Sequence, residues 1–420
     1  MLKNLFHRET PYHQTSVEAE SGLGATRRPV DRSWASAPWR AFIVALGLFV
    51  FAAPIGCGEG SGDPEPKVTS DTHEIMGEIF GAMRELLPLS VQSEELSDPS
   101  RRDQVASSIR TLSRNSGMLA AHVGGKDAQL QFLARSITDD THELERAYQE
   151  ERFERAAFLL RNLTENCVVC HTRLSSETDS PVTQGFIEET VFDGLELEPR
   201  ATLQIATRQF DSALDTLERL FASSISPVTM LGPLTDYLVV SIRVKRDYER
   251  PIPTLERFAG RPDLWTQLRA EVETWVEALP ELKVRASGDP DVATARSLLG
   301  EARQMVDFPA DRRWLAHLVV ASDILERYID SHPPPDPHLA EAYYLLGITE
   351  ARIGRNYWVT PAPFLLETSI RMSNGESFAA DAFALLEQEL LMSYEGSDYE
   401  EIPADERAVL DELEAMLDLP

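Results

Sequence analysis

The chain is poor in cysteine and in positive charge, and each shortage argues against a class of protein. Its 420 residues include three cysteines, too few for a disulfide framework. Lysine and arginine number 40 against 69 acidic residues, for a formal net charge of −29. Nucleic acid is therefore disfavoured as a partner, because phosphate binding needs a basic face. The acidity either keeps the chain soluble or steers it toward a basic partner.

The chain also lacks an apolar run long enough for an ordinary membrane helix, which needs about 20 residues. Residues 41–56 form an uncharged apolar run of 16 residues. This length is typical of the hydrophobic region of an export signal, and the run is preceded by Arg27, Arg28, Arg32 and Arg40. The sequence therefore predicts that the protein is exported.

Cys57 directly follows the apolar run and precedes residues 58–66, whose glycine, serine and proline content predicts a flexible tether. This order resembles a bacterial lipoprotein, and the resemblance implies that Cys57 is lipidated and holds the protein at a membrane. Pro54 stands where an aliphatic residue is usual. A cleaved soluble protein and an uncleaved anchor therefore remain alternatives, and all three place the chain outside the cytoplasm.

Strand-like alternation is absent, and apolar residues recur at helical spacing through most of the chain. After residues 1–66, the anchor and tether, we expect a four-helix bundle over 67–176, because four amphipathic segments follow with short connections. The first covers Thr72–Leu87 and ends near Pro88, and the second opens at Asp98-Pro99. The third runs from Leu130 to Tyr148 and the fourth from Phe153 to His171, with a turn near Gln149–Glu151.

Residues 177–196 are expected to be a linker, and residues 197–420 a domain of helical repeats. The segment from Arg208 to Arg219 is echoed 38 residues later by the segment from Arg246 to Arg257. A further unit, Ala340–Gly347, resembles the first helix of a tetratricopeptide repeat, with a second glycine at Gly354 and a following helix near Phe364–Arg371. The fold class predicted for the whole chain is all-α.

The strongest chemical signal is the pentad Cys167-Val168-Val169-Cys170-His171. Covalent attachment of haem c needs two thiols and one imidazole that binds iron. On a helix the two thiols are one turn apart and the imidazole is four residues after the first, so all three can reach one porphyrin. A zinc site would need a further ligand pair, which is missing, and a thioredoxin-type pair would follow a strand.

A four-helix bundle with such a pentad near the end of its last helix resembles the cytochrome c′ and cytochrome c-556 group. The resemblance covers about residues 67–176. It implies that His171 is the proximal iron ligand of one covalent haem c and that Cys167 and Cys170 carry its thioether bonds. The apolar stripe of the fourth helix runs into the pentad, so we expect the haem to lie in the core of the bundle.

Members of this group either leave the sixth iron position open or fill it with a methionine of the first helix. Met76 lies early in the first helix, level with His171 in an antiparallel bundle, and is the first candidate. His73, one turn earlier, and an open site are the alternatives, whereas Met83 is expected to be core. His122 and His142 are expected to be ordinary surface or satisfied histidines, with contact to the haem or its propionates as the minor alternative. We assign no chemistry to His317, His332 and His338.

Together these features predict an exported, membrane-anchored monohaem electron carrier on the periplasmic side, rather than an enzyme. Its helical repeats would dock a redox partner protein. Two other functions remain open at this stage. One is a haem-based gas or redox sensor with an open sixth iron site, and the other is a scaffold protein that contains haem.

Overall fold

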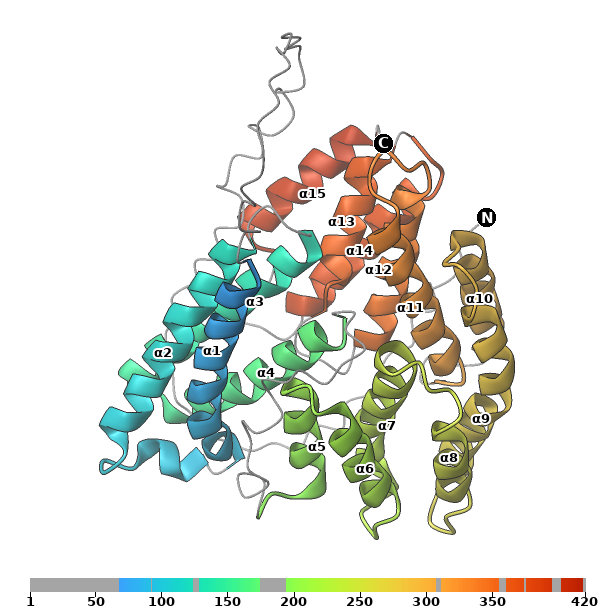
Figure 1. Ribbon diagram of the computed structural model, residues 1–420. Coiled ribbons are helices and arrows are strands. Elements are labelled where there is room, and N and C mark those ends of the chain that lie inside the picture. Colours follow the sequence, from blue (N-terminus) through green and yellow to red (C-terminus); the bar gives the residue numbers. More distant parts are fainter. Residues whose placement is uncertain are drawn as a thin grey trace, which may run out of the picture.

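The computed structural model describes residues 68–91, 93–123, 128–173, 194–306, 311–354, 360–373, 375–394 and 402–417. Within these ranges every regular element is helical and no strand occurs, so the expected all-α fold is confirmed (Figure 1). No helix in this part of the chain is long and apolar enough to cross a membrane. The apolar run 41–56 and Cys57 lie outside the described residues.

The first four α-helices pack as a group. Each contacts the next, and α1 also contacts α4, so the four share one core. Buried leucine and isoleucine side chains fill this core, among them Leu86, Ile109, Leu144 and Leu160. The helices are α1 (Val68–Val91), α2 (Arg102–His122), α3 (Ala128–Gln149) and α4 (Phe153–His171), with a short 3₁₀ helix η3 (Ser93–Ser97) between the first two.

Two of the expected helix ends are wrong by about one turn. Pro88 does not end α1 but lies inside it, because a proline near the end of a helix removes only one backbone donor. Asp98 caps the turn that lies between it and α2, and not α2 itself. Its Oδ1 accepts hydrogen bonds from the amide and hydroxyl of Ser100, both at 2.8 Å. Consequently α2 begins at Arg102, four residues beyond Asp98.

The rest of the chain forms a second run of helices, and its first member begins at Leu197, where the repeat domain was expected. Their bounds are α5 (Leu197–Ala206), α6 (Phe210–Phe221), η5 (Pro227–Met230), α7 (Leu231–Leu238), η6 (Val239–Val244), α8 (Pro251–Ala259), α9 (Thr266–Ala286), α10 (Val292–Gln304), α11 (Leu315–Ser331), α12 (Leu339–Ile353), α13 (Ala362–Met372), α14 (Ala379–Tyr394) and α15 (Ala404–Met416). Of these, η6 is a π-helix that continues α7.

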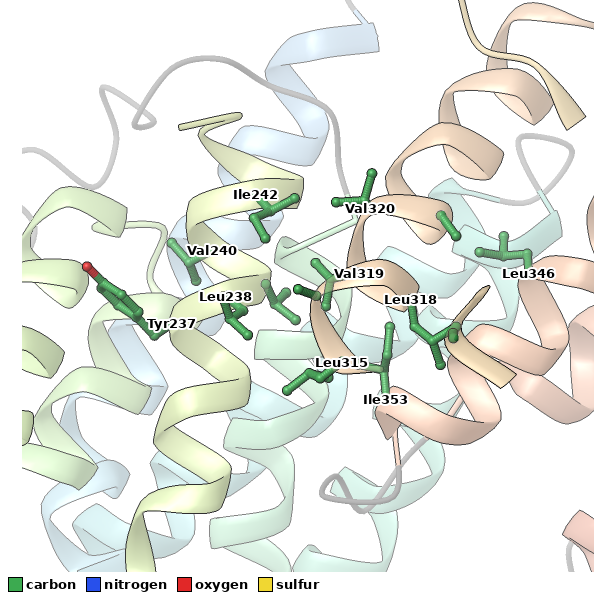
Figure 2. Packing of buried hydrophobic residues seen from close by; sticks show 14 of the residues in the cluster. Tyr237, Leu238, Val240, Ile242, Leu315, Leu318, Val319, Val320, Leu346 and Ile353 are labelled. Carbon is green, nitrogen blue, oxygen red and sulfur yellow. The ribbon is translucent and has the colours of Figure 1, made fainter. Parts of the chain in front are cut away.

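A single large core joins this second run of helices. Figure 2 shows its centre, where Leu238 and Ile242 of α7 and η6 face Leu315 and Val319 of α11, and α12 adds Leu346. These five side chains are all buried. The π-helix therefore lies in the interior, packed directly against α11.

The close approach of α12 and α13 depends on Gly347. A Cβ atom at this position would lie 2.7 Å from Cδ2 of Leu366 on α13, nearer than packed carbon atoms approach. Gly354, one residue after α12, is similarly close to Thr360. The helix expected near residues 364–371 lies within α13, so the predicted helix pair is confirmed.

Three of the turns between helices contain a residue in the left-handed region. Glu151, Arg208 and Arg246 have positive φ angles of 58°, 61° and 51°, although none is glycine. In each case an aromatic residue follows two positions later and is buried or half-buried: Phe153, Phe210 and Tyr248. The 38-residue echo from Arg208 to Arg246 therefore includes a left-handed residue followed by an aromatic one, and the turn from α3 to α4 contains the same pair. The closing hydrogen bond spans five residues after Glu151 and Arg208 and six after Arg246.

Candidate functional site

The pentad occupies the last turn and a half of α4, beyond the core of the four-helix group. Leu160 and Leu163 belong to that core, whereas Val168 belongs to the large core of the second half. In Figure 1, α4 runs from the four-helix group toward the middle of the molecule, and its contact with α5 agrees with this view. The pentad therefore lies at the junction of the two halves, rather than within the bundle core as expected.

The two thiols have apolar surroundings and are not bonded to each other. Cys167 is half-buried against the large core, and Cys170 is buried in a small cluster with Val169 and Leu133 of α3. Burial raises the pKa of Cys167 to about 12 and that of Cys170 to about 11. Both side chains are consequently neutral thiols at physiological pH, rather than thiolates.

Aromatic side chains extend the small cluster toward the second half. Phe132, which packs against this cluster, stacks on Phe364 of α13 with ring centroids 5.5 Å apart. Helix α3 also contacts α13 directly. The surroundings of Cys170 are thus built from α3, α4 and α13, that is, from both halves of the chain.

His171 is held in one tautomer by the main chain of α5. Its Nδ1 lies 2.6 Å from the carbonyl oxygen of Ala206, the last residue of α5. Because a carbonyl oxygen only accepts, Nδ1 carries the proton and donates, which leaves the lone pair on Nε2. Burial, with a smaller effect from Arg208, lowers the pKa of His171 to about 4, so the ring is neutral. A neutral imidazole oriented through Nδ1 is the form that binds a metal through Nε2.

A buried cluster of charges follows directly after the pentad. Arg173 donates from Nη1 to the carbonyl of Val169 at 2.9 Å, and its guanidinium pairs with Glu350 of α12 and, at 3.4 Å, with Glu326 of α11. Arg243 of η6 pairs with the same Glu350 at 2.7 Å. All four side chains are at most 12% exposed. This charge cluster ties the end of α4 to three helices of the second half.

The candidates for the sixth iron position lie on α1. Met76 is half-buried against the core of the four-helix group, and Met83 is buried deeper in the same core. His73 belongs to α1, but its side chain lies outside the described residues. The clusters that contain the pentad do not include Met76, so the structure does not group this side chain with Cys170 or His171.

The other histidines differ in exposure. His122 is half-buried at the end of α2, His142 is exposed on α3, and His317 is buried on α11, where burial lowers its pKa. His332 stacks on Tyr328 with ring centroids 4.0 Å apart, and His338 is exposed. None of them belongs to the clusters around the pentad.

The residues present fit a covalently attached haem. Two neutral thiols one helical turn apart and an imidazole with Nδ1 already engaged are the groups that attachment requires. Within the described ranges no group of three or more His, Cys, Asp or Glu side chains is arranged to hold a metal ion. A haem iron needs fewer protein ligands than a bare metal ion, because the porphyrin supplies four of them.

Two features of the site were not foreseen from the sequence. The carbonyl of Ala206 is 35 residues from His171, and Glu350 is 177 residues from Arg173. No local pattern signals a backbone acceptor, and nothing in the sequence near Arg173 identifies Glu350 as its partner. No protein family, no curated protein and no solved structure matches the chain.

Proposed function

We propose that the chain is an exported monohaem c-type cytochrome that carries electrons, with its haem bound at Cys167, Cys170 and His171. The observation that carries the proposal is the hydrogen bond from Nδ1 of His171 to the carbonyl of Ala206, at the end of a helix that presents two thiols one turn apart. This hydrogen bond fixes the imidazole as the neutral ligand that iron requires.

Each residue of the pentad has a distinct role in this proposal. Cys167 and Cys170 would hold the haem covalently, because a thiol can add its sulfur and hydrogen across a vinyl group with no leaving group. His171 would hold the iron through Nε2, and the apolar side chains around Cys170 would exclude water. A bound haem would supply an iron that gains and loses one electron.

The resemblance to the cytochrome c′ and cytochrome c-556 group supports the proposal for residues 67–176. The position of the pentad adds that the haem would contact both halves of the molecule, because Val168 belongs to the core of the second half. The helical repeats would then hold a redox partner protein near the haem. A lipid on Cys57 would keep the whole assembly on the periplasmic face of a membrane.

The test is covalent haem attachment. The full chain, made in a host with a haem-attachment system, should keep its haem through denaturing electrophoresis, detected by the peroxidase activity of haem. Cys167→Ala with Cys170→Ala should abolish the signal, because both sulfur bonds are lost.

Cys57→Ser is the matched control, since it removes the third cysteine and should leave the haem signal unchanged. A wild-type chain without haem on such a gel would contradict the proposal. Loss of the signal in Cys57→Ser alone would contradict the assignment of the two thiols.

A further inference from the structure

An open hollow lies on the outer side of the four-helix group, between α2 and α3. It has a volume of about 450 Å³. Five of its lining residues come from α2 and one from α3: Ser107, Arg110, Thr111, Ser113, Arg114 and Glu145. None of these residues belongs to the pentad or to the charge cluster of Arg173.

The two arginines bring positive charge to this hollow without a carboxylate partner. Arg110 and Arg114 are exposed and lie one helical turn apart, and no ion pair joins either of them to a carboxylate in the described ranges. Two other arginines of the four-helix group are paired: Arg102 lies 2.8 Å from Glu151, and Arg155 lies 2.6 Å from Glu143. In a chain of net charge −29, Arg110 and Arg114 concentrate two uncompensated positive charges beside one hollow.

The hydroxyl groups of the hollow are also available. Serine and threonine inside helices commonly donate to the carbonyl four residues earlier, as Ser116 does to Leu112 at 2.8 Å. Ser113 is 4% exposed, yet its hydroxyl makes no hydrogen bond within the described part of the chain. A serine hydroxyl that lines an open hollow without an internal partner can donate to a ligand bound there.

We propose that this hollow binds a phosphate group. Two guanidinium groups and three hydroxyls offer more donors than one carboxylate can accept, whereas a phosphate has more oxygens and more charge. The phosphate belongs either to a small soluble molecule or to the headgroup of an anionic phospholipid. Glu145 at the rim opposes an anion and therefore weakens the site. This proposal is independent of the haem.

The experiment measures binding of the full chain to two probes. Pyrophosphate is titrated by calorimetry, and vesicles of phosphatidylcholine with or without phosphatidylglycerol are tested by co-sedimentation. Arg110→Gln with Arg114→Gln should lower the affinity at least about tenfold, because hydrogen bonds to charged groups are lost. Glu145→Gln should raise it.

The matched control is Arg219→Gln with Arg303→Gln, which removes two exposed arginines from α6 and α10. This control should bind like the wild type. Loss of pyrophosphate binding specific to the α2 variant identifies a soluble phosphate, and loss confined to vesicles with phosphatidylglycerol identifies a lipid headgroup. Equal loss in both double variants, or no wild-type binding to either probe, overturns the proposal.

Discussion

At the scale of single residues, the second protein ligand of the proposed haem would distinguish an electron carrier from a sensor. Met76 is half-buried and packs against the four-helix core on α1. A thioether on iron keeps the haem low-spin and slows the entry of small ligands, because the iron–sulfur bond must break first. Met76→Ala should therefore give a high-spin ferrous spectrum and fast carbon monoxide binding, measured by absorbance after rapid mixing.

Met83→Ala is the matched control, because Met83 lies deeper in the same core at 5% exposure. It should leave the spectrum low-spin and lower the free energy of unfolding by about 2–5 kcal/mol. A Met76→Ala variant that stays low-spin would transfer the ligand role to His73. A wild-type haem that is already high-spin and binds carbon monoxide at once would favour the sensor function.

The two glutamates of the charge cluster should respond in opposite ways to neutralisation. Glu350 is 1% exposed and pairs with both Arg173 and Arg243, so Glu350→Gln leaves two buried guanidiniums undercompensated. We expect the free energy of unfolding to fall by about 3–5 kcal/mol, measured by urea denaturation. Glu326 is held less closely, with its Oε1 3.4 Å from Arg173 and 4.0 Å from Arg243.

Burial raises the pKa of Glu326, with a smaller contribution from Asp323 and Asp330, against the lowering effect of Arg243 and Arg173. Above the ordinary glutamate pKa, the unfolded chain loses this proton first, so stability falls as pH rises toward the raised value. Glu326→Gln should therefore be more stable than the wild type at pH 7, with the difference vanishing below about pH 4. A variant less stable than the wild type at both pH values would contradict this.

The pentad could be located from sequence because its geometry is local. Cys167, Cys170 and His171 lie on α4 in the spacing that the helical pattern predicted. The partners of these residues could not be predicted, since Ala206 and Glu350 reach the site only through tertiary packing. The same packing moves the pentad out of the four-helix core, which the apolar stripe of α4 alone did not indicate.

At the scale of elements, the contact between α12 and α13 can be tested at Gly347. Gly347→Ala places a methyl group 2.7 Å from Cδ2 of Leu366, so the helices must separate or Leu366 must change rotamer. We expect a loss of about 1–3 kcal/mol in the free energy of unfolding. Gly300→Ala on α10 is the control, because nothing lies within 4 Å of its added carbon.

Leu366→Ala in the Gly347→Ala background should recover part of that overpacking cost, which a double-mutant cycle measures. Strictly additive effects of the two substitutions would show that the helices do not meet at this point.

Helix periodicity predicted α3, α4 and α13 well because their apolar faces repeat regularly. It fails at the end of α1 and at the start of α2, because single residues such as Pro88 and Asp98 do not fix the ends of these helices. The π-helix η6 had no local signal. This π-helix packs against α11, and the periodicity of apolar residues carries no information about such a tertiary contact.

At the scale of the whole molecule, each of the two predicted domains contributes a side chain to the core of the other. Leu203 of α5 belongs to the core of the four-helix group, and Val168 of α4 belongs to the core of the second half. A chain ending at residue 176 therefore loses contacts on α4 and leaves Arg173 without Glu350. We expect it to unfold at lower urea concentration than the full chain, monitored by circular dichroism.

In the full chain, haem absorbance and circular dichroism should report coincident unfolding transitions, because the pentad lies at the junction. A truncated chain as stable as the full one would contradict this coupling and would support the separate domain over 67–176 that the sequence suggested.

The left-handed turns at Glu151, Arg208 and Arg246 mark positions between which helical segments could be gained or lost in related proteins. Each turn follows one helix and precedes another; the aromatic residue two positions later begins α4 and α6, whereas Tyr248 lies three residues before α8. A turn with its two flanking helices can be treated as one segment. Because neighbouring segments make most of the contacts, one of them can be inserted or deleted in frame at modest cost. Homologous chains should therefore differ in length by steps near the 38 residues that separate Arg208 from Arg246, with the pentad retained.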